Sequence, residues 1–273
     1  MGRQQESFPD AKTDLKTLKE TPETPQTRAP AFRLAFADAD FLCRDELRAT
    51  RIQLEMLKPE MILAERGIES TVVMFGGARI PDPEHKKSAR TETLAELSKY
   101  YDEARKFAKI ITEKSMKSYG RENVIVTGGG PGVMEAGNRG AVDAGGASIA
   151  LNIVLPFEQT PNEYCTPELC FNFHYFATRK IHFLMRAKAV TAFPGGFGTL
   201  DELFETLTLI QTQRMRRVPV ILFGEKFWRS IINWETLAEA GTIGADDLKL
   251  FSFVETADEA VAILTEWDAN NPD

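Results

Sequence analysis

The sequence lacks the features of a membrane protein or of a disulfide-stabilised secreted protein. Its three cysteines cannot all pair with one another, which suits a reducing compartment. No apolar run approaches the roughly 18 residues of a membrane span, and the first seven residues contain no apolar core of a signal peptide. We therefore expect a soluble, cytoplasmic protein without a membrane partner.

Basic residues are also in deficit, with 33 Lys and Arg against 40 Asp and Glu and a formal net charge of -7. Proteins that bind nucleic acid draw most of their affinity from clustered Lys and Arg, so we expect no nucleic-acid partner. Any anionic ligand must be held by local groups. The 273 residues, 43% of them apolar, are enough for one large α/β domain with a full core.

The beginning of the chain differs in composition from the rest. Residues 1–30 contain four Pro and five Thr but few large apolar side chains, so residues 1–35 are predicted to be a disordered or draped arm. Apolar residues such as Leu47, Leu54 and Leu57 then recur at helical spacing, which predicts a helical segment over residues 36–68. Residues 69–273 are predicted to form the main domain.

In that domain, short β-rich runs alternate with longer segments of helical periodicity. This alternation predicts an α/β fold, a doubly wound, Rossmann-like open parallel sheet flanked by helices, in a single domain with a helical N-terminal extension. The predicted strands cover residues 71–75, 123–127, 148–154, 170–175, 189–193 and 218–223. The predicted helices cover residues 86–118, 131–144, 178–187, 199–213, 225–240 and 256–267.

Thirteen of the 19 glycines lie in three clusters, at residues 76–77, 128–146 and 195–198. Each cluster begins within two residues of the end of a predicted strand, at the edge of the sheet where open α/β folds bind ligands. Glycine loops that open helices present free N–H groups to anions, so the clusters favour phosphate binding over tight turning alone. The ATPase and dinucleotide motifs are incomplete, which disfavours P-loop ATPase and NAD-binding functions.

A local excess of positive charge lies between Leu169 and Leu200, where there is no Asp or Glu. Thr178 is predicted to cap a helix, which would place Arg179 and Lys180 in its first turn, where the helix dipole disfavours cations. A violated local rule often marks a functional site, although the two residues could also be solvated surface cations.

The segment 193–202 is the most specific in the chain. Within it, Thr199 and Glu202 have the spacing of a capping box, in which Glu202 would only close the start of a helix. A catalytic carboxylate is the alternative. The position of Glu202 beside a glycine loop, and close in sequence to Arg179 and Lys180, favours catalysis.

Residues 175–180 (YFATRK) and 194–202 (PGGFGTLDE) resemble the paired Arg-Lys and PGGxGTxxE motifs of the LOG ("lonely guy") family. Residues 128–135 (GGGPGVME) resemble the first glycine motif of the longer bacterial members, and the similarity spans residues 71–234. Members of this family are nucleoside 5′-monophosphate phosphoribohydrolases, often mislabelled lysine decarboxylases, and longer relatives include AMP nucleosidases.

The resemblance implies a role for each matching residue. Glu202 would activate water or stabilise the ribosyl cation, Arg179 would be its catalytic companion, and Lys180 would add a supporting charge. Glu135 would bind ribose hydroxyls, although a glutamate on the surface of a helix is the commoner explanation. The phosphate and ribose would be held by Gly129, Gly130, Gly132, Gly195, Gly196, Gly198 and Thr199. The resemblance implies a nucleotide substrate and a homo-oligomer. No cofactor is expected, since the sequence offers no convincing ligand set for a metal or for pyridoxal phosphate.

Three alternatives compete with this hypothesis. Cys165, Cys170, His174 and His182 lack the close pairing of zinc ligands. A pyridoxal-phosphate enzyme needs a Schiff-base lysine, for which Lys180 is the only candidate, and it sits beside an arginine. A nucleotide-binding or cofactor-carrier protein could use the same glycine loops without chemistry, but it would not need Glu202 with Arg179.

Overall fold

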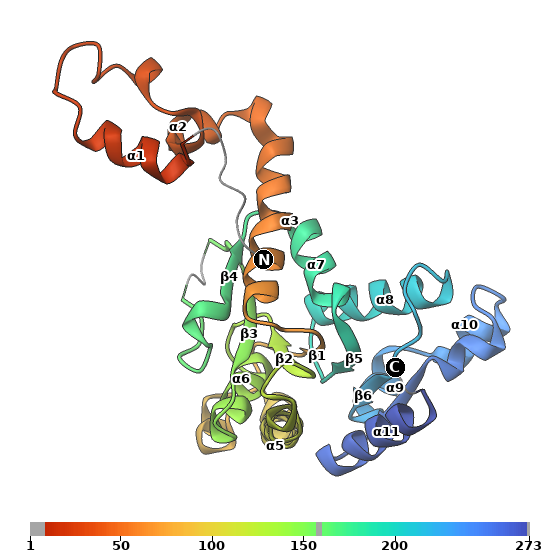
Figure 1. The fold of residues 1–273 in the computed structure, drawn as a ribbon. Helices are drawn as coiled ribbons and strands as arrows, with labels where there is room; N and C mark the ends of the chain where they lie inside the picture. The colour runs from red at the N-terminus through yellow and green to blue at the C-terminus, as the bar shows by residue number, and fades with distance from the viewer. Residues whose placement is uncertain (1–8, 157–159, 272–273) are drawn as a thin grey trace. The chain divides into compact units, whose positions relative to one another are not determined.

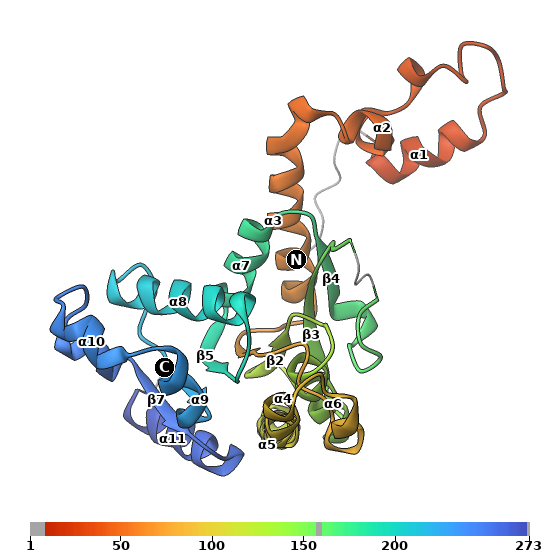
Figure 2. The same ribbon diagram turned by 180° about the vertical axis from the view of Figure 1, so that it is seen from behind.

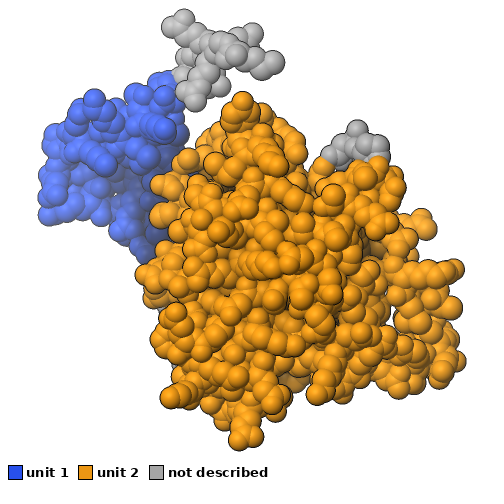
Figure 3. All heavy atoms as spheres, turned by 90° about the horizontal axis from the view of Figure 1, so that it is seen from below, with its two compact units in different colours: residues 1–54 blue, residues 55–273 orange. Residues whose placement is uncertain are grey.

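The computed structural model describes residues 9–156 and 160–271. The chain divides into two compact units, Met1–Leu54 and Glu55–Asp273, shown in separate colours in Figure 3. The division falls inside helix α3 (Arg48–Glu65). The predicted boundaries at residues 35 and 68 stay predictions.

The described part of the first unit is helical. Helix α1 (Ala11–Lys19) is capped by Asp10, whose side chain accepts a hydrogen bond from the Thr13 amide, and α2 (Ala39–Leu42) is capped by Asp38. Short 3-10 turns occupy Pro30–Phe32, Ala35–Ala37 and Asp45–Leu47. Asp38 is the one buried side chain among the described residues of this unit, so capping and ion pairs hold it more than an apolar core does.

The second unit is built on a seven-stranded, all-parallel sheet in the order β4-β3-β2-β1-β5-β6-β7 (Figure 1). The strands are β1 (Thr71–Phe75), β2 (Val124–Thr127), β3 (Ser148–Ile153), β4 (Cys170–Phe173), β5 (Ala187–Ala192), β6 (Val220–Phe223) and β7 (Phe251–Val254). The chain winds from β1 outward to β4 and then returns to β5 beside β1. The strand order therefore reverses between β1 and β5, as predicted for a doubly wound Rossmann-like sheet.

The side chains of β1 alternate between two apolar cores because successive residues of a strand point to opposite faces. Val73 and Phe75 pack into one core, and Val72 and Met74 into the other. Helices cover both faces, which is why β1 is buried along its whole length (Figures 1 and 2). The helices of this unit after α3 are α4 (Glu92–Glu96), α5 (Lys99–Ser115), α6 (Val133–Asp143), α7 (Phe176–Met185), α8 (Phe197–Gln211), α9 (Glu225–Ile231), α10 (Trp234–Glu239) and α11 (Ala257–Asn270).

Several predicted boundaries were wrong, each for a local reason. The helix predicted over residues 86–118 is interrupted, because Thr91 accepts a hydrogen bond from the Leu94 amide and starts α4, and α5 begins separately. The helix predicted over residues 225–240 is divided by Asn233, which caps α10. Strand β7 was not predicted. In the described part of the chain, no helix is long and apolar enough to cross a membrane.

Candidate active site

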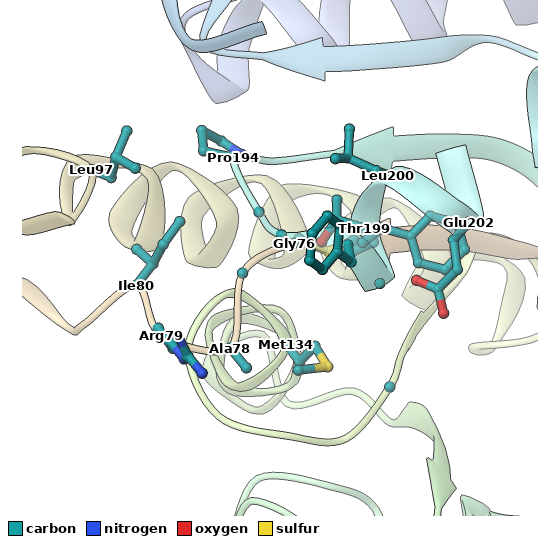
Figure 4. A pocket seen from close by; sticks show the side chains of 18 of the residues that line it. Gly76, Ala78, Arg79, Ile80, Leu97, Met134, Pro194, Thr199, Leu200 and Glu202 are labelled. Carbon is teal, nitrogen blue, oxygen red and sulfur yellow. The ribbon is translucent and has the colours of Figure 1, made fainter. Parts of the chain in front are cut away.

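A cavity of about 830 Å³ opens at the carboxyl ends of β1, β2 and β5, where the strand order reverses (Figure 4). Its walls come from the loop after β1, the loop after β5 and the first turns of α7 and α8. Its volume and position match those of small-molecule sites in open α/β folds.

The glycine loops at this edge pack tightly against one another. The Gly77 amide donates a hydrogen bond to the Pro194 carbonyl at 2.9 Å. A Cβ atom at Gly132, where φ is +68°, would lie 2.4 Å from the Gly77 oxygen, and one at Gly195 would lie 2.2 Å from the Thr199 hydroxyl. Gly132 and Gly195 are therefore required by the packing of the loops, before any ligand is considered.

The start of α8 has a different character. The helix begins at Phe197 with Gly196 as its N-cap, and no side chain caps it. A Cβ atom added at Gly196 or Gly198 would meet no protein atom within 4 Å. Both glycines and Thr199 line the cavity, so the free amides of the first turn lie at its wall.

This helix start corrects the capping-box prediction. Because α8 begins at Phe197 and not at Thr199, Glu202 lies in the second turn, beyond the N-cap amide. Its carboxylate instead accepts a hydrogen bond from Arg179 at 3.1 Å. Glu202 therefore does not close the helix.

The prediction that Thr178 caps α7 was also wrong. The helix begins at Phe176, and Thr178 lies inside it, with its hydroxyl oxygen 2.9 Å from the Tyr175 carbonyl oxygen. Arg179 and Lys180 consequently lie beyond the first three helical residues, and the predicted conflict with the helix dipole is weaker than expected.

Arg179 is buried, with 8% of its surface exposed. Its Nε donates to the Leu151 carbonyl at 2.7 Å, and its guanidinium lies 4.9 Å from the centre of the Phe183 ring. A Cβ atom at Gly128 would lie 2.6 Å from Nη2 of Arg179, so the glycine makes room for the guanidinium. The alternative that Arg179 is a solvated surface cation is wrong.

Burial changes the proton affinity of both partners. It raises the pKa of Glu202 to about 7, although the positive charge of Arg179 opposes the rise. Burial also lowers the pKa of Arg179, which the carboxylate of Glu202 counteracts. A carboxyl group poised near neutrality in a cavity has the proton affinity needed for acid–base catalysis.

Lys180 does not line this cavity. Its ammonium group lies 3.0 Å from the Asp201 carboxylate and 2.9 Å from that of Glu205, both on α8. The structure therefore places Lys180 as a second link between α7 and α8, beside the Arg179–Glu202 pair.

The first glycine loop contributes less to the cavity than its motif implies. Gly128 and Met134 line it, whereas Gly129, Gly130 and Gly132 do not. Glu135 also lies outside the lining, and its carboxylate accepts a hydrogen bond from the Tyr101 hydroxyl at 2.6 Å.

Sequence reasoning missed the apolar part of the cavity wall. These residues come from elements outside the glycine motifs, and apolar residues at helical spacing are indistinguishable in sequence from core residues. They include Ile80, Leu94, Leu97, Leu155, Phe227 and Ile231. Arg79, in the loop after β1, also lines the cavity. Among the residues that the structure describes, no group of three or more His, Cys, Asp and Glu is arranged to hold a metal ion.

Comparison with known proteins agrees with the motifs. A family model described as "Possible lysine decarboxylase" matches residues 134–264. A "Bifunctional cytokinin biosynthesis protein" of Fusarium pseudograminearum is 34% identical over 73 residues, which cover 26% of this chain and 15% of that protein. These matches, like the motifs, show that the chain is similar to the LOG family, and the chain spans less than a sixth of the length of the cytokinin biosynthesis protein.

Three solved structures are similar to this chain over most of its length. A structural-genomics target is 21% identical and covers 72% of this chain and 99% of its own, with a TM-score of 0.48. A molybdenum cofactor binding protein from Rippkaea orientalis is 16% identical, covering 72% and 96%, with a TM-score of 0.47. A molybdenum cofactor carrier protein from Chlamydomonas reinhardtii is 19% identical, covering 74% and 99%, with a TM-score of 0.48.

Proposed function

We propose that the protein hydrolyses the N-glycosidic bond of a purine nucleoside 5′-monophosphate, AMP or an N6-modified AMP, to the free base and ribose 5-phosphate. The observation that carries the proposal is the buried pair of Arg179 and Glu202 on the wall of the cavity. A protein that only binds a nucleotide has no need of a buried carboxyl group with a pKa near 7.

The 5′-phosphate is assigned to the start of α8. The uncapped first turn offers backbone N–H groups and the positive end of the helix dipole, and Gly196 and Gly198 leave space for an anion. Arg79 also lines the cavity and can add positive charge. In this arrangement, the ribose extends from the phosphate toward Glu202.

Hydrolysis passes through a transition state with positive charge at C1′ of the ribose. The oxygen of a water molecule bonds to C1′ while the bond from C1′ to the base breaks, and the bonding electron pair leaves with the base. Ionised Glu202 accepts a proton from the water and stabilises the developing charge. The departing base takes up one proton from solvent, and Glu202 afterwards releases its proton to solvent. Arg179 holds Oε1 of the carboxylate in place.

Decarboxylation of lysine is a poorer explanation of this cavity. Pyridoxal phosphate, which such an enzyme would need, bonds to a lysine side chain. None of the described residues that line the cavity is a lysine, and Lys180 is paired with Asp201 and Glu205.

The deciding experiment is incubation of the purified protein with AMP, followed by chromatographic detection of adenine and ribose 5-phosphate. Adenosine is the matched substrate control, since it lacks only the phosphate that α8 is proposed to hold. We expect AMP to be hydrolysed far faster than adenosine. Tight binding of AMP without turnover would favour the nucleotide-binding or carrier alternative, and equal hydrolysis of adenosine would refute the phosphate assignment.

A further inference from the structure

The start of α7 is closed by a residue that lies more than 100 positions earlier in the chain. The N-cap residue, Tyr175, supplies no side-chain cap of its own. Instead, the Glu55 carboxylate accepts hydrogen bonds from the backbone amides of His174 at 2.7 Å and Tyr175 at 3.3 Å. It also accepts one from the hydroxyl of Thr178 at 2.7 Å.

Two further contacts continue along the same pair of helices. The backbone oxygen of Glu55 lies 2.9 Å from Nε2 of His182, one turn further along α7. Glu60, also on α3, forms an ion pair with Arg186 just beyond the end of α7. The part of α3 that belongs to the second unit therefore contacts α7 from its start to its end.

Glu55 is well placed to fix the position of α7 along its axis. A carboxylate at a helix N-terminus satisfies free amides and is stabilised by the helix dipole. Thr178, which Glu55 holds, is the residue before Arg179, and Arg179 reaches Glu202 at 3.1 Å. A carboxylate therefore lies at the start of α7, whereas no side chain caps the start of α8.

We propose that Glu55 is a positioning residue, which holds the start of α7 so that the guanidinium of Arg179 stays in contact with Glu202. Glu55 does not line the cavity and acts only through α7. Its effect on turnover rests on the proposed function, whereas its effect on the Arg179–Glu202 contact does not.

The carboxyl group of Glu202 reports the position of Arg179. Burial raises its pKa most; among the neighbouring charges, Arg179 and Lys180 on α7 lower the pKa, and Asp201 and Glu205 on α8 raise it. If the start of α7 loses its hydrogen bonds to Glu55, Arg179 moves away from Glu202. Its positive charge then no longer favours the ionised form of the Glu202 carboxyl group. The pKa of Glu202 then rises further, and the pH dependence of any reaction that uses the carboxylate moves to higher pH.

The kinetic test compares Glu55→Ala and Glu55→Gln with the parent in AMP hydrolysis. In Glu55→Ala we expect kcat to fall about 10- to 100-fold, as displaced catalytic groups do, with a smaller change in KM. The acid limb of the pH–activity profile of Glu55→Ala should also move to higher pH. Glu55→Gln keeps one acceptor oxygen, so its kcat and its pH profile should lie between those of the parent and those of Glu55→Ala. The matched control is Glu60→Gln, which changes a carboxylate of the same helix that pairs at the far end of α7 and should keep the parental pH profile.

A second measurement needs no substrate. The carboxyl carbons of glutamate are labelled with carbon-13, the Glu202 signal is assigned by its loss in Glu202→Gln, and it is titrated by NMR in the parent and the Glu55 variants. We expect the Glu202 titration to move to higher pH in Glu55→Ala. If that variant does not fold, the same comparison is made with Glu55→Gln, which preserves the shape of the side chain.

The two proposals fail in different ways. An unchanged Glu202 titration in a folded Glu55 variant overturns the positioning role, whatever the activity. A shifted titration in a protein that does not hydrolyse AMP supports the positioning role and overturns the proposed function. A variant with lower thermal stability, but with a parental titration and pH profile, shows that Glu55 is merely structural.

Discussion

At Glu202, burial and an opposite charge act on one carboxyl group in opposite directions. Burial disfavours the ionised form, while Arg179 favours it, and the result is a pKa of about 7. Removing the carboxylate without changing its shape therefore tests both its chemistry and its structural role. The two roles predict different magnitudes.

Glu202→Gln should remain folded, with a melting temperature within a few degrees of the parent, and should still bind AMP. Turnover should fall on the order of a hundredfold or more, because a general base and a stabilising negative charge are lost together. The matched control is Glu205→Gln, which removes a carboxylate one turn away on α8 that pairs with Lys180. Near-parental turnover in Glu202→Gln would refute the catalytic role.

The raised pKa of Glu202 also predicts the pH dependence. Water activation needs the ionised carboxylate, so kcat/KM of the parent should fall as the pH drops below about 7. The free energy of unfolding should depend on pH in the opposite sense, because the contribution of Glu202 is larger at low pH. Between the ordinary pKa of 4.5 and about 7, the folded state binds the proton more tightly than the unfolded chain does. The contribution of Glu202 to the free energy of unfolding is therefore lost as the pH rises through this window.

Activity and denaturation measured across pH 5 to 9, in the parent and in Glu202→Gln, check both statements. The variant should show a flatter dependence of stability on pH, since its amide does not titrate. An activity profile that is flat through pH 7 would contradict the assignment of Glu202 as the group that must be ionised.

At the scale of the elements, local sequence predicted that α7 and α8 exist but placed both starts two residues too late. Thr178 and Thr199 are good N-cap residues by type, and that preference determined the predictions. In the structure, Thr199 packs against Gly195, and the start of α7 is closed by Glu55. A cap supplied from another helix leaves no signal in the local sequence. The contact between Arg179 and Glu202 joins two different helices, so the spacing of residues within one helix could not predict it either.

Two glycines near the start of α8 should respond in opposite ways to the same substitution. Gly195→Ala should lower the free energy of unfolding by about 1 to 3 kcal/mol, because the new Cβ would press on the Thr199 hydroxyl at 2.2 Å. Gly198→Ala should leave stability unchanged or improve it, since its Cβ would meet no protein atom.

The expected cost of Gly198→Ala lies in binding. The added methyl group enters the space assigned to the phosphate, so KM for AMP should rise while the melting temperature holds. Thermal denaturation and steady-state kinetics on the two variants measure this contrast. An unchanged KM in Gly198→Ala would place the phosphate elsewhere in the cavity.

At the scale of the whole molecule, the fold class and the inner strands could be predicted because buried parallel strands are continuous apolar runs followed by glycine. Strand β7 was not predicted; it is an edge strand, the exposed Ser252 interrupts its apolar run, and no glycine follows it. The apolar wall of the cavity could not be predicted, because its residues come from α4, α9 and the loop after β3, which lie together only in the folded protein. The homo-oligomer stays a prediction, which light scattering can test.

The first unit provides the last prediction. Asp38 is the only side chain that its described residues bury, so this segment contributes little apolar burial to the stability of the protein. Removing residues 1–43 keeps all of α3, including Glu55 and its contacts with α7. The shortened chain should therefore melt within a few degrees of the full chain and keep its kcat for AMP. A large loss of kcat with an unchanged melting temperature would instead assign the removed residues a direct part in the reaction.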